Sequence, residues 1–515
     1  ASAVIDKYGN EIWNTGEEGS FDLLINHINE SGNIYGLSAY DFPNNTGTKI
    51  NYDRDFLWSA PTSSPEYAVD IHEIKQIPNG NYMAFVPDYQ LGPIPEGGWT
   101  FYYQAIGYQA DGVTYEYPWI GMRIVEWDED GNEVWNWDPF AHFTMDDTDL
   151  YGGIWWDLQS GAHDWMHSNA FHFDDQESVI YVSHRHLSRI SKIAYPSGEV
   201  IWNIGMPEQY NTGSDNICTD LGNSFQHNIQ LLDDGTLLFF DNGNLSPMLM
   251  GDDNPISRIR RIRVIDNSYC ETEWEYELPA NLFGLGMGSV QLLDNGNYLL
   301  YTFGNGLNQA QPTLREVSPD YEVVWNYQGA GNAAWYRTYK IPSLHPDAFS
   351  VVADGYVTDQ ENSLILVSDN SVSFTVYNES DYALSYKYML TDLMDGGTPL
   401  FEYNEGELYI EPNTDAQISF SMNSNASISD TDIMLSVWPV LHEYALKELS
   451  FSVSANPSIL GDINYDGSID VIDVVLMVNM ILGNDDLDLS VSDLNNDGEL
   501  NVVDIVILVN LILSF

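Results

Sequence analysis

Residues 71–83 read IHEIKQIPNGNYM, and this stretch decides the fold. Apolar and polar residues alternate on both sides of a Pro-Asn-Gly turn, which is typical of a β-hairpin. Similar hairpins are predicted over residues 167–182, 227–240 and 289–301, and a poorer copy over residues 24–37. Five copies indicate one repeated β unit.

A strand with a tryptophan near its end follows each hairpin, and a sixth such strand lies at the N-terminus. We expect the N-terminal strand to complete a last sheet that begins near residues 337–344, so that both ends close a ring. Radial repetition of this kind predicts a six-bladed β-propeller over residues 1–346, with a pair of β-sandwiches as the alternative. The six tryptophans are Trp13, Trp58, Trp135, Trp202, Trp274 and Trp325.

The next region, residues 347–457, lacks the tryptophan signature. About seven short strands in this length predict an immunoglobulin-like β-sandwich. No constellation of catalytic groups occurs in it, so we interpret it as a spacer. The expected strands cover residues 363–367, 372–376, 383–389, 408–410, 416–422, 433–437 and 449–453.

The tail, residues 458–515, holds a second repeat. The pattern Asp-x-Asn-x-Asp-Gly begins at Asp462 and recurs 31 residues later at Asp493. An apolar helical segment follows each copy, at residues 474–482 and 505–513. We therefore predict a small α-helical module built on paired loops.

Each loop carries oxygen ligands at positions 1, 3, 5 and 12, with glycine at position 6, which is the spacing of a calcium loop. Without a cation, the clustered carboxylates would repel one another and oppose closure of the loop. We therefore expect two structural Ca²⁺ sites. With the residue at position 7, the predicted ligands are Asp462, Asn464, Asp466, Ser468 and Asp473 in the first loop, and Asp493, Asn495, Asp497, Glu499 and Asp504 in the second.

These paired loops resemble a type I dockerin over residues 460–515. The resemblance implies docking onto a cohesin-like domain of an extracellular assembly. Loop positions 10 and 11, often hydroxylic in dockerins, are apolar here, at residues 471–472 and 502–503. A more apolar partner, another copy of the chain or the chain's own sandwich therefore remain alternatives.

Charge limits the possible partners, because 77 acidic and 17 basic residues give a net charge of −60. Such a chain lacks the basic surface that a nucleic-acid binder needs. The acidic, lysine-poor composition favours a secreted protein, extracellular or at the cell surface, and a start at Ala1 would suit a mature chain after removal of a leader. No apolar run approaches the ~20 residues of a membrane span. Cys218 and Cys270 could be bridged or could be two buried thiols.

Three histidines occupy one position of the repeat. His72 and His227 each stand eight residues before the hairpin glycine, and His167 stands eight residues before Asp175. Equivalent positions in successive blades point the same way, so we expect three imidazoles to meet in the central funnel. The alternative is that each histidine is bonded within its own blade.

A histidine cluster could ligate zinc, shuttle protons or act as a nucleophile. Arg185 lies on the return strand of the His167 hairpin, and a fixed cation there disfavours zinc but favours an oxyanion such as sulfate or phosphate. Arg189, Lys192 and the arginines of residues 258–263 are expected nearby, so that the local field outweighs the net charge.

Residues 1–346 resemble the arylsulfotransferases, which pass a sulfuryl group from an aryl sulfate to a phenol without a nucleotide cofactor. The resemblance implies that His227 is the nucleophile that becomes transiently sulfated. It implies that His72, His167 and Arg185 hold the sulfuryl oxygens and handle the phenol's proton, and that Asn169 contacts the substrate. The matching segments are DIHE at 70–73, DWMHSN at 164–169, SHRH at 183–186, FQHN at 225–228, FDNG at 240–243 and GSVQ at 288–291.

The leading hypothesis is therefore a secreted arylsulfotransferase-like enzyme that a calcium-dependent module tethers to an extracellular assembly. One alternative is a non-catalytic structural or adhesive surface or filament protein, with the propeller as scaffold and the tail for subunit assembly. Another is a lectin-like propeller that binds sulfated compounds without covalent chemistry.

Overall fold

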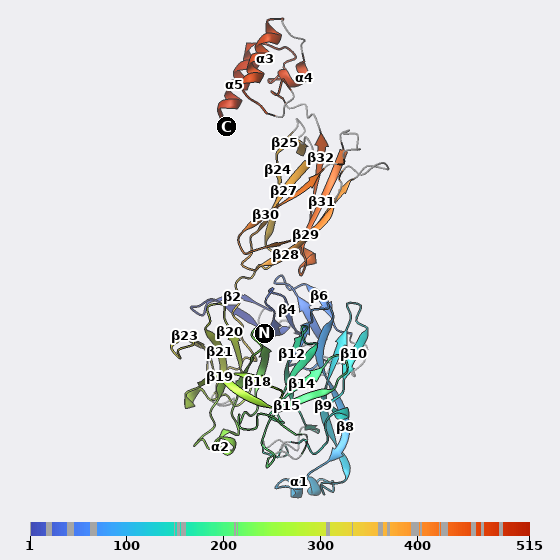
Figure 1. The fold of residues 1–515 in the computed structure, drawn as a ribbon, viewed down its shortest axis with the longest axis vertical. Coiled ribbons are helices and arrows are strands. Elements are labelled where there is room, and N and C mark those ends of the chain that lie inside the picture. The colour runs from blue at the N-terminus through green and yellow to red at the C-terminus, as the bar shows by residue number, and fades with distance from the viewer. Residues whose placement is uncertain are drawn as a thin grey trace. The chain divides into compact units, whose positions relative to one another are not determined.

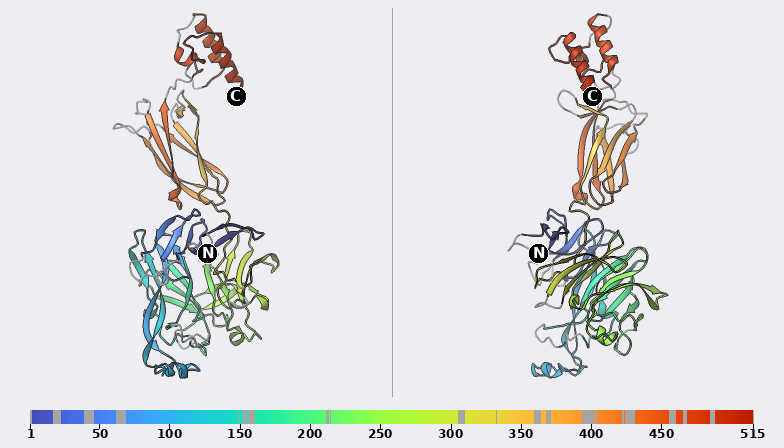
Figure 2. Two further views of the ribbon diagram at one scale, coloured as in Figure 1. Left: turned by 180° about the vertical axis from the view of Figure 1, so that it is seen from behind. Right: turned by 90° about the vertical axis from the view of Figure 1, so that its left-hand side faces the viewer.

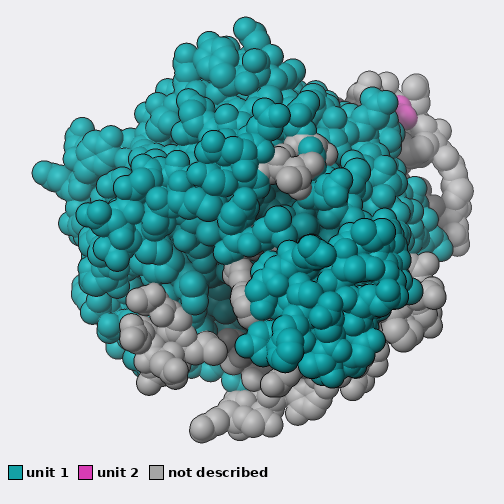
Figure 3. Space-filling model, turned by 90° about the horizontal axis from the view of Figure 1, so that it is seen from below, with its two compact units in different colours: residues 1–29, 33–341 teal, residues 30–32, 342–515 magenta. Residues whose placement is uncertain are grey.

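The computed structural model of the chain is mainly β, with a helical module at its C-terminus (Figure 1). It divides into two compact units, residues 1–29 with 33–341 and residues 30–32 with 342–515, and Figure 3 shows the first of them in teal. The structure describes residues 2–16, 23–38, 46–61, 69–148, 150–151, 155, 161–210, 213, 215–304, 310–331, 333–358, 364–367, 371–392, 401, 404–421, 423, 431–454, 460–464, 468–483 and 488–514.

Within these residues, the first unit contains six sheets that follow one another along the chain, none of them closed into a barrel. Neighbouring strands are antiparallel, except that the short β11 runs parallel to β9. The sheets are β1 (Ala3–Ile5) and β2 (Glu11–Asn14); β3 (Leu23–Ile28), β4 (Ile34–Ser38), β5 (Thr46–Ile50) and β6 (Phe56–Ser59); β7 (Ile74–Gln76), β8 (Tyr82–Pro93), β9 (Tyr115–Trp127), β10 (Glu133–Trp137) and β11 (His163–Asp164); β12 (Ser168–Asp174), β13 (Val179–His184), β14 (Arg189–Ala194) and β15 (Val200–Ile204); β16 (His227–Leu231), β17 (Leu237–Asp241), β18 (Arg258–Ile265) and β19 (Tyr269–Glu277); and β20 (Ser289–Leu292), β21 (Tyr298–Gly304), β22 (Ala310–Val317) and β23 (Val323–Gln328).

The six repeated tryptophans make one cyclic set of hydrogen bonds. Each lies on the last strand of its sheet and donates its indole N–H to the last hairpin turn of the next sheet. The tryptophan of the sixth sheet donates to the turn of the first, so the set closes on itself. The pairs are Trp13 to Tyr52 O, Trp58 to Glu129 O, Trp135 to Pro196 O, Trp202 to Asn267 Oδ1, Trp274 to Pro319 O and Trp325 to Lys7 O, at 2.7 to 3.1 Å.

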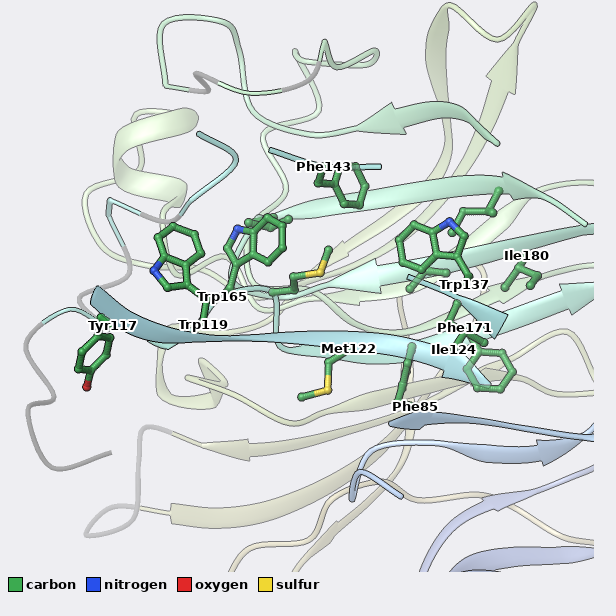
Figure 4. Close-up of a cluster of buried hydrophobic side chains, with 14 of the residues drawn as sticks. Phe85, Tyr117, Trp119, Met122, Ile124, Trp137, Phe143, Trp165, Phe171 and Ile180 are labelled. Atoms are coloured by element: carbon green, nitrogen blue, oxygen red, sulfur yellow. The ribbon is translucent and has the colours of Figure 1, made fainter. Parts of the chain in front are cut away.

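Apolar packing follows the same cyclic order. The largest cluster joins the third and fourth sheets, where Phe85 of β8 meets Phe171 of β12 edge to face (Figure 4). At the junction of the last sheet with the first, Ile5 of β1 packs against Tyr301 and Leu314. Each sheet thus buries apolar side chains against both of its neighbours, which contributes roughly 25 cal/mol per Å² of apolar surface removed from water.

Residues 337–344 do not form the strand expected for the last sheet, so β1 and β2 stand as a two-stranded sheet among the described residues. This segment runs between β20 and β3 and is held by side-chain bonds. The hydroxyl of Ser289 accepts from Thr338 N at 3.1 Å, and the hydroxyl of Tyr339 donates to Asn26 O at 3.1 Å. Side chains take the bonds that a strand ladder would need, which is why the expectation of a strand fails.

A disulfide joins Cys218 to Cys270, which settles the alternative that the sequence leaves open. It ties the segment before β16 to β19 of the same sheet. Because His227 begins β16, the bridge also limits the freedom of the chain that leads to this histidine.

The second unit begins with two sheets that share one core (Figure 2). Phe374, Tyr386 and Leu435 are fully buried in this core. The seven strands that the sequence predicts are all present, and two more, β24 and β25, are not predicted. The sheets are β24 (Phe349–Asp354), β27 (Ser371–Asn378) and β30 (Asp415–Ser421); and β25 (Tyr356–Thr358), β26 (Leu364–Val367), β32 (Lys447–Ser454), β31 (Thr431–Pro439), β28 (Leu384–Asp392) and β29 (Glu405–Ile410).

The tail forms α3 (Val471–Ile481), α4 (Leu489–Ser492) and α5 (Val502–Ser514). Asp470 caps α3 by accepting from Ile472 N at 2.7 Å, and the backbone N–H of Asp470 donates to the side chain of Asp473 at 2.8 Å. This capping box starts the helix three residues before the predicted segment. None of the described helices has the length and apolar character of a membrane span.

We expect Trp325→Phe to lower the free energy of unfolding in two ways. The smaller ring buries less apolar surface, and the loss of one indole donor of the cyclic set costs about a further 1 kcal/mol. Denaturant unfolding of the full chain measures this. Trp335→Phe is the matched control, since Trp335 is half-buried in the same cluster and its indole N–H has no acceptor among the described residues. Equal destabilisation by the two variants would contradict a role for the hydrogen bond.

Candidate active site

The three histidines of the repeat stand at the starts of the innermost strands of three successive sheets. His72 precedes β7, His167 precedes β12 and His227 begins β16. The pairing register shifts at the start of both β12 and β16, and His167 has φ of +48° while Asn228 has φ of +58°. Bulges and left-handed residues re-aim side chains at functional sites.

Two of these imidazoles are in direct contact. The rings of His72 and His167 lie edge to face with centroids 4.6 Å apart, and a third ring, His186 on the β13–β14 turn, lies 4.6 Å from His167. Each Nδ1 atom faces an oxygen: that of His72 contacts Asp70, and that of His167 contacts Asp164. Because carboxylates accept hydrogen bonds, the Nδ1 atom of each ring carries a proton.

His227 is fixed in the same tautomer by a different partner. Its Nδ1 lies 2.7 Å from Asn242 Oδ1, while the amide nitrogen of Asn242 donates to Gly284 O at 2.8 Å and to Met287 O at 2.9 Å. The two carbonyls orient the amide, so Oδ1 can only accept and His227 must donate from Nδ1. Its Nε2 lone pair is therefore free for a nucleophilic role.

Arg185 is placed beside these histidines by the β13–β14 turn. Its backbone N–H donates to His167 O at 3.2 Å, and its guanidinium lies over the ring of Phe225 at 4.5 Å and donates to Leu285 O at 3.3 Å. Burial and the positive charge of Arg185 hold the pKa of His227 well below its usual range, and His167 and His72 act in the same direction. The four groups expected from the sequence therefore interact electrostatically at one place.

Burial also lowers the pKa of His167, although the carboxylate of Asp164 raises it again. Asp164 itself stays ionised, because His167 and His186 lower its pKa despite its own burial. The His227 ring, with its lowered pKa, thus interacts with an imidazole that a carboxylate keeps closer to protonation, and general acid–base chemistry uses such pairs.

Asp164, His167 and His186 also have potential ligand atoms within 4.8 Å of one another. The Nδ1 atoms are engaged, since His167 Nδ1 contacts the carboxylate and His186 Nδ1 donates to Asp164 O at 2.6 Å, whereas Asp164 Oδ1 has no hydrogen-bond partner among the described residues. Asp164 thus accepts from two imidazoles, and Arg185 adds a positive charge beside them. This donor set fits an anion-binding site better than the zinc alternative.

Asn169 is buried and has a supporting position. Its amide nitrogen donates to Gln226 O at 2.9 Å, directly before His227. Its backbone carbonyl accepts from Arg337 at 2.6 Å and from the Tyr336 hydroxyl at 2.8 Å. Arg337 also pairs with Glu73 at 2.6 Å, and the ring of Tyr336 lies edge-on to His72 at 5.5 Å.

Sequence reasoning assigns no role to several of these partners. Asp70 and Asp164 could have been found, since each precedes its histidine by two or three residues. Asn242 and Arg337 give no local signal, because they reach their partners across 15 to 264 residues of sequence. The glycine at the fourth equivalent position, Gly288, has φ of +110°, and a Cβ there would lie 2.8 Å from the Phe240 ring.

The basic residues that the sequence analysis places near the site, Arg189, Lys192 and the arginines of residues 258–263, supply little excess positive charge to it, contrary to expectation. Each forms an ion pair with at least one carboxylate, mostly on neighbouring strands of the same sheet. The pairs are Arg189 with Asp147, Lys192 with Glu177, Arg258 with Glu277, Arg260 with Asp241, Arg261 with Asp234 and Arg263 with Glu273.

In the tail, the carboxylates at the ends of both predicted calcium loops are buried: Asp462 and Asp473 in the first loop, Asp493 and Asp504 in the second. No lysine or arginine occurs in residues 448–515 to compensate them. Buried carboxylates require a cation or hydrogen bonds, and oxygen clusters of this kind suit Ca²⁺. Asp504 takes backbone N–H bonds from across its loop, at 3.0 Å from Leu494 N. Asp466 lies outside the described residues.

Comparison with known families agrees with this geometry. Residues 105–340 match the family described as Arylsulfotransferase (ASST), and residues 460–513 match the Dockerin type I domain. The chain joins an arylsulfotransferase-family region to a type I dockerin domain. Type I dockerins bind calcium and dock onto cohesins, and arylsulfotransferases act on aryl sulfates and phenols. The arylsulfotransferase match contains His167, Arg185 and His227 but begins after His72.

No curated protein matches the chain. Among solved structures, a periplasmic gluconolactonase of Pseudomonas aeruginosa is 9% identical, covers 81% of this chain and 94% of its own, and has a TM-score of 0.35. Hydrazine synthase of Kuenenia stuttgartiensis is 10% identical over 70% of this chain and 79% of its own, with a TM-score of 0.30. These TM-scores are too low to support an argument about fold or function.

We expect Arg185→Gln to raise the pKa of His227 toward its ordinary value, because the substitution removes a positive charge that disfavours the imidazolium. The pKa should stay below the ordinary value, since burial remains. NMR titration of carbon-13-labelled histidines measures it, with His227→Ala to assign the signal. Arg263→Gln is the control, as Arg263 is paired with Glu273 away from the histidines. An unchanged pKa in Arg185→Gln would mean that the guanidinium does not face His227.

Proposed function

We propose that the chain is a secreted aryl-sulfate sulfotransferase that passes a sulfuryl group to a phenolic acceptor through a sulfohistidine on His227. The observation that carries this proposal is the Asn242–His227 hydrogen bond, which leaves the Nε2 lone pair of a neutral imidazole free beside Arg185. His72, His167 and Arg185 are the proposed groups for the sulfuryl oxygens and the phenol proton. Asn169 is proposed to support this arrangement.

In the first half-reaction, the Nε2 lone pair of His227 attacks sulfur, a nitrogen–sulfur bond forms, and the sulfur–oxygen bond to the aryl group breaks. The departing phenolate takes the Nε2 proton of a protonated His167, which Asp164 stabilises and which becomes a neutral ring. The sulfated ring keeps its Nδ1 proton, and Asn242 Oδ1 stabilises the positive charge that develops on the ring. Arg185 stabilises negative charge on the sulfuryl oxygens.

In the second half-reaction, His167 takes the proton of an acceptor phenol, and the phenolate oxygen attacks sulfur. The nitrogen–sulfur bond breaks and returns the electron pair to Nε2 of His227. Proton and sulfuryl group are conserved over the cycle, so no nucleotide cofactor is needed. Asp164 supports both steps because its charge stabilises protonated His167.

The proposed framework is a six-bladed β-propeller over residues 1–346, supported by the cyclic tryptophan bonds and the cyclic order of the cores. An immunoglobulin-like sandwich is proposed over residues 347–457 and the docking module over residues 458–515. Two structural Ca²⁺ ions are proposed in the module. Secretion fits a dockerin and the net charge of −60.

We expect His227→Ala to reduce sulfuryl transfer from an aryl sulfate to a phenol by at least about 10³-fold, because the variant lacks the nucleophile. Release of the donor phenol measures the first half-reaction, and intact mass after brief exposure to the donor detects one added sulfuryl group. His345→Ala, an exposed histidine of the second unit, is the control. A parent protein without transfer or adduct across a panel of aryl sulfates would contradict the proposal.

A second candidate function, a structural or adhesive protein assembled through its tail, is favoured by one observation. The exposed faces of α3 and α5 are apolar at matching positions of the two repeats, as a docking surface would be. The first turns of both helices contribute, including the residues at loop positions 10 and 11. These exposed residues are Val471, Ile472 and Val475 on α3, and Val502, Val503 and Val506 on α5.

We expect removal of Ca²⁺ to unfold α3 and α5, because uncompensated carboxylates would then oppose closure of the loops. Far-UV circular dichroism with and without a chelator measures the loss of helix. Asp504→Asn should weaken Ca²⁺ binding by at least about tenfold, whereas Glu448→Gln, an exposed carboxylate on β32, should not. If transfer survives the chelator while docking is lost, the two functions belong to separate domains. Docking without any turnover would favour the structural candidate.

A further inference from the structure

The hairpin of β8 and β9 is the longest in the first unit and projects beyond its neighbours together with α1 (Thr100–Ala105) (Figure 1). β7 pairs only with residues 82–84 of β8, whereas β9 pairs with β8 as far as Pro93. Beyond residue 86, the edge of β8 that faces the β7 side has no backbone partner among the described residues. Among the described residues, which leave out 62–68, this part of the β8 edge is therefore open.

The direction of the backbone groups on this edge follows from the register. Phe85 N donates to Glu73 O on the β7 side, so odd-numbered residues of β8 face that side. Tyr89 agrees, because its N–H donates to the side chain of Asp88 and not to β9. Leu91 has the same parity, and its N–H and C=O point to the open edge.

Prolines bracket the open edge. Pro87 and Pro93 share the outward parity of Tyr89 and Leu91 but have no N–H to donate. The N–H of Tyr89 already donates to Asp88 Oδ1 at 2.9 Å, so Leu91 is left as the outward residue whose N–H has no acceptor among the described residues. Because a strand rises about 3.4 Å per residue, the edge suits an extended segment of about five residues.

The open edge leads to the candidate active site. It continues the line of β7, which His72 precedes, and Asp70 N donates to Phe85 O at 2.8 Å where the edge begins. On the other side, Asp164 pairs with Ile120, which lies opposite Tyr89. Two strand spacings, about 10 Å, thus separate Tyr89 from Asp164.

Aromatic side chains accompany the edge. Tyr89, Leu91 and Tyr115 lie on one face of the hairpin and are 61%, 57% and 62% exposed. The opposite face is packed, with Tyr117 and Trp119 buried among other aromatic rings (Figure 4). The exposure is thus a property of a firmly packed hairpin.

Charge indicates the kind of partner. Residues 87–118 contain four acidic residues, Asp88, Glu96, Asp111 and Glu116, and no lysine or arginine. Nucleic acids and sulfated glycans would be repelled. A polypeptide with aromatic and basic side chains would stack on the tyrosines and satisfy the acidic charge, and its backbone would satisfy the open edge.

We propose that the open edge of β8 binds an extended, basic and aromatic polypeptide by strand addition and directs it toward His72. Resting on the proposed function, a tyrosine of this polypeptide is the phenolic acceptor. A second copy of the chain is the competing occupant.

Titration calorimetry of the full chain with a short synthetic peptide of alternating lysine and tyrosine tests the binding. The comparison peptide has the same sequence with alternate backbone amides methylated, which removes strand pairing but keeps the side chains. We expect the unmodified peptide to bind at least about tenfold more tightly. Leu91→Pro should weaken its binding by about tenfold, because it removes an outward N–H without breaking the ladder to β9. Leu91→Val should not.

Equal binding of the two peptides to the parent chain would overturn the proposal, and this comparison does not depend on a variant that folds. Binding unchanged in a Leu91→Pro chain with the parent's thermal midpoint would overturn it as well. Concentration-dependent dimerisation that Leu91→Pro abolishes would assign the edge to a second copy instead. Transfer to a small phenol should be equal in Leu91→Pro and parent. Peptide binding without any transfer would contradict the sulfotransferase proposal, but it would support strand addition at the edge of β8.

Discussion

The ring of indole hydrogen bonds is the constraint on which the rest of the first unit depends. One tryptophan of each sheet donates its indole N–H to the next sheet, and Trp325 of the last sheet donates to Lys7 O of the first. A single bond of this kind contributes on the order of 1 kcal/mol, but a closed set leaves no sheet with an unattached outer strand. Closure also brings the starts of the innermost strands together. The site exists because the ring holds those starts at one place.

The hydrogen-bond acceptors of the three histidines then determine which ring nitrogen carries the proton. From its position in the repeat alone, each of the three imidazoles could have presented either ring nitrogen to the site. Asp70, Asp164 and Asn242 each accept from an Nδ1 atom, so these nitrogens carry the ring protons. The acceptors differ in charge. Burial and the charge of Arg185 keep the pKa of His227 well below its usual range despite the Asn242 hydrogen bond, whereas the carboxylate of Asp164 offsets part of the effect of burial on His167.

The net charge of −60 and an anion-binding site are compatible because the charges act over short distances. At physiological ionic strength, exposed charges are screened beyond about 8 Å. Most arginines outside the site are paired with carboxylates, so they stabilise sheets and add little to the local field. The guanidinium of Arg185 lies over the ring of Phe225, donates to Leu285 O and lowers the pKa of His227. In the tail the same acidity is concentrated in loops that suit Ca²⁺.

The sequence by itself determined the local features: hairpins from period-two alternation, tryptophan strands, calcium-type loops, and the equivalence of His72, His167 and His227. Each of these depends on residues close together in the chain, where spacing fixes geometry. The tertiary structure alone decided which distant groups meet: the Asn242 partner of His227, the Arg337–Glu73 pair, and the course of residues 337–344 between β20 and β3 without a strand. Such contacts depend on how the six sheets of the first unit pack together, and no short-range pattern encodes which side chains that packing brings together.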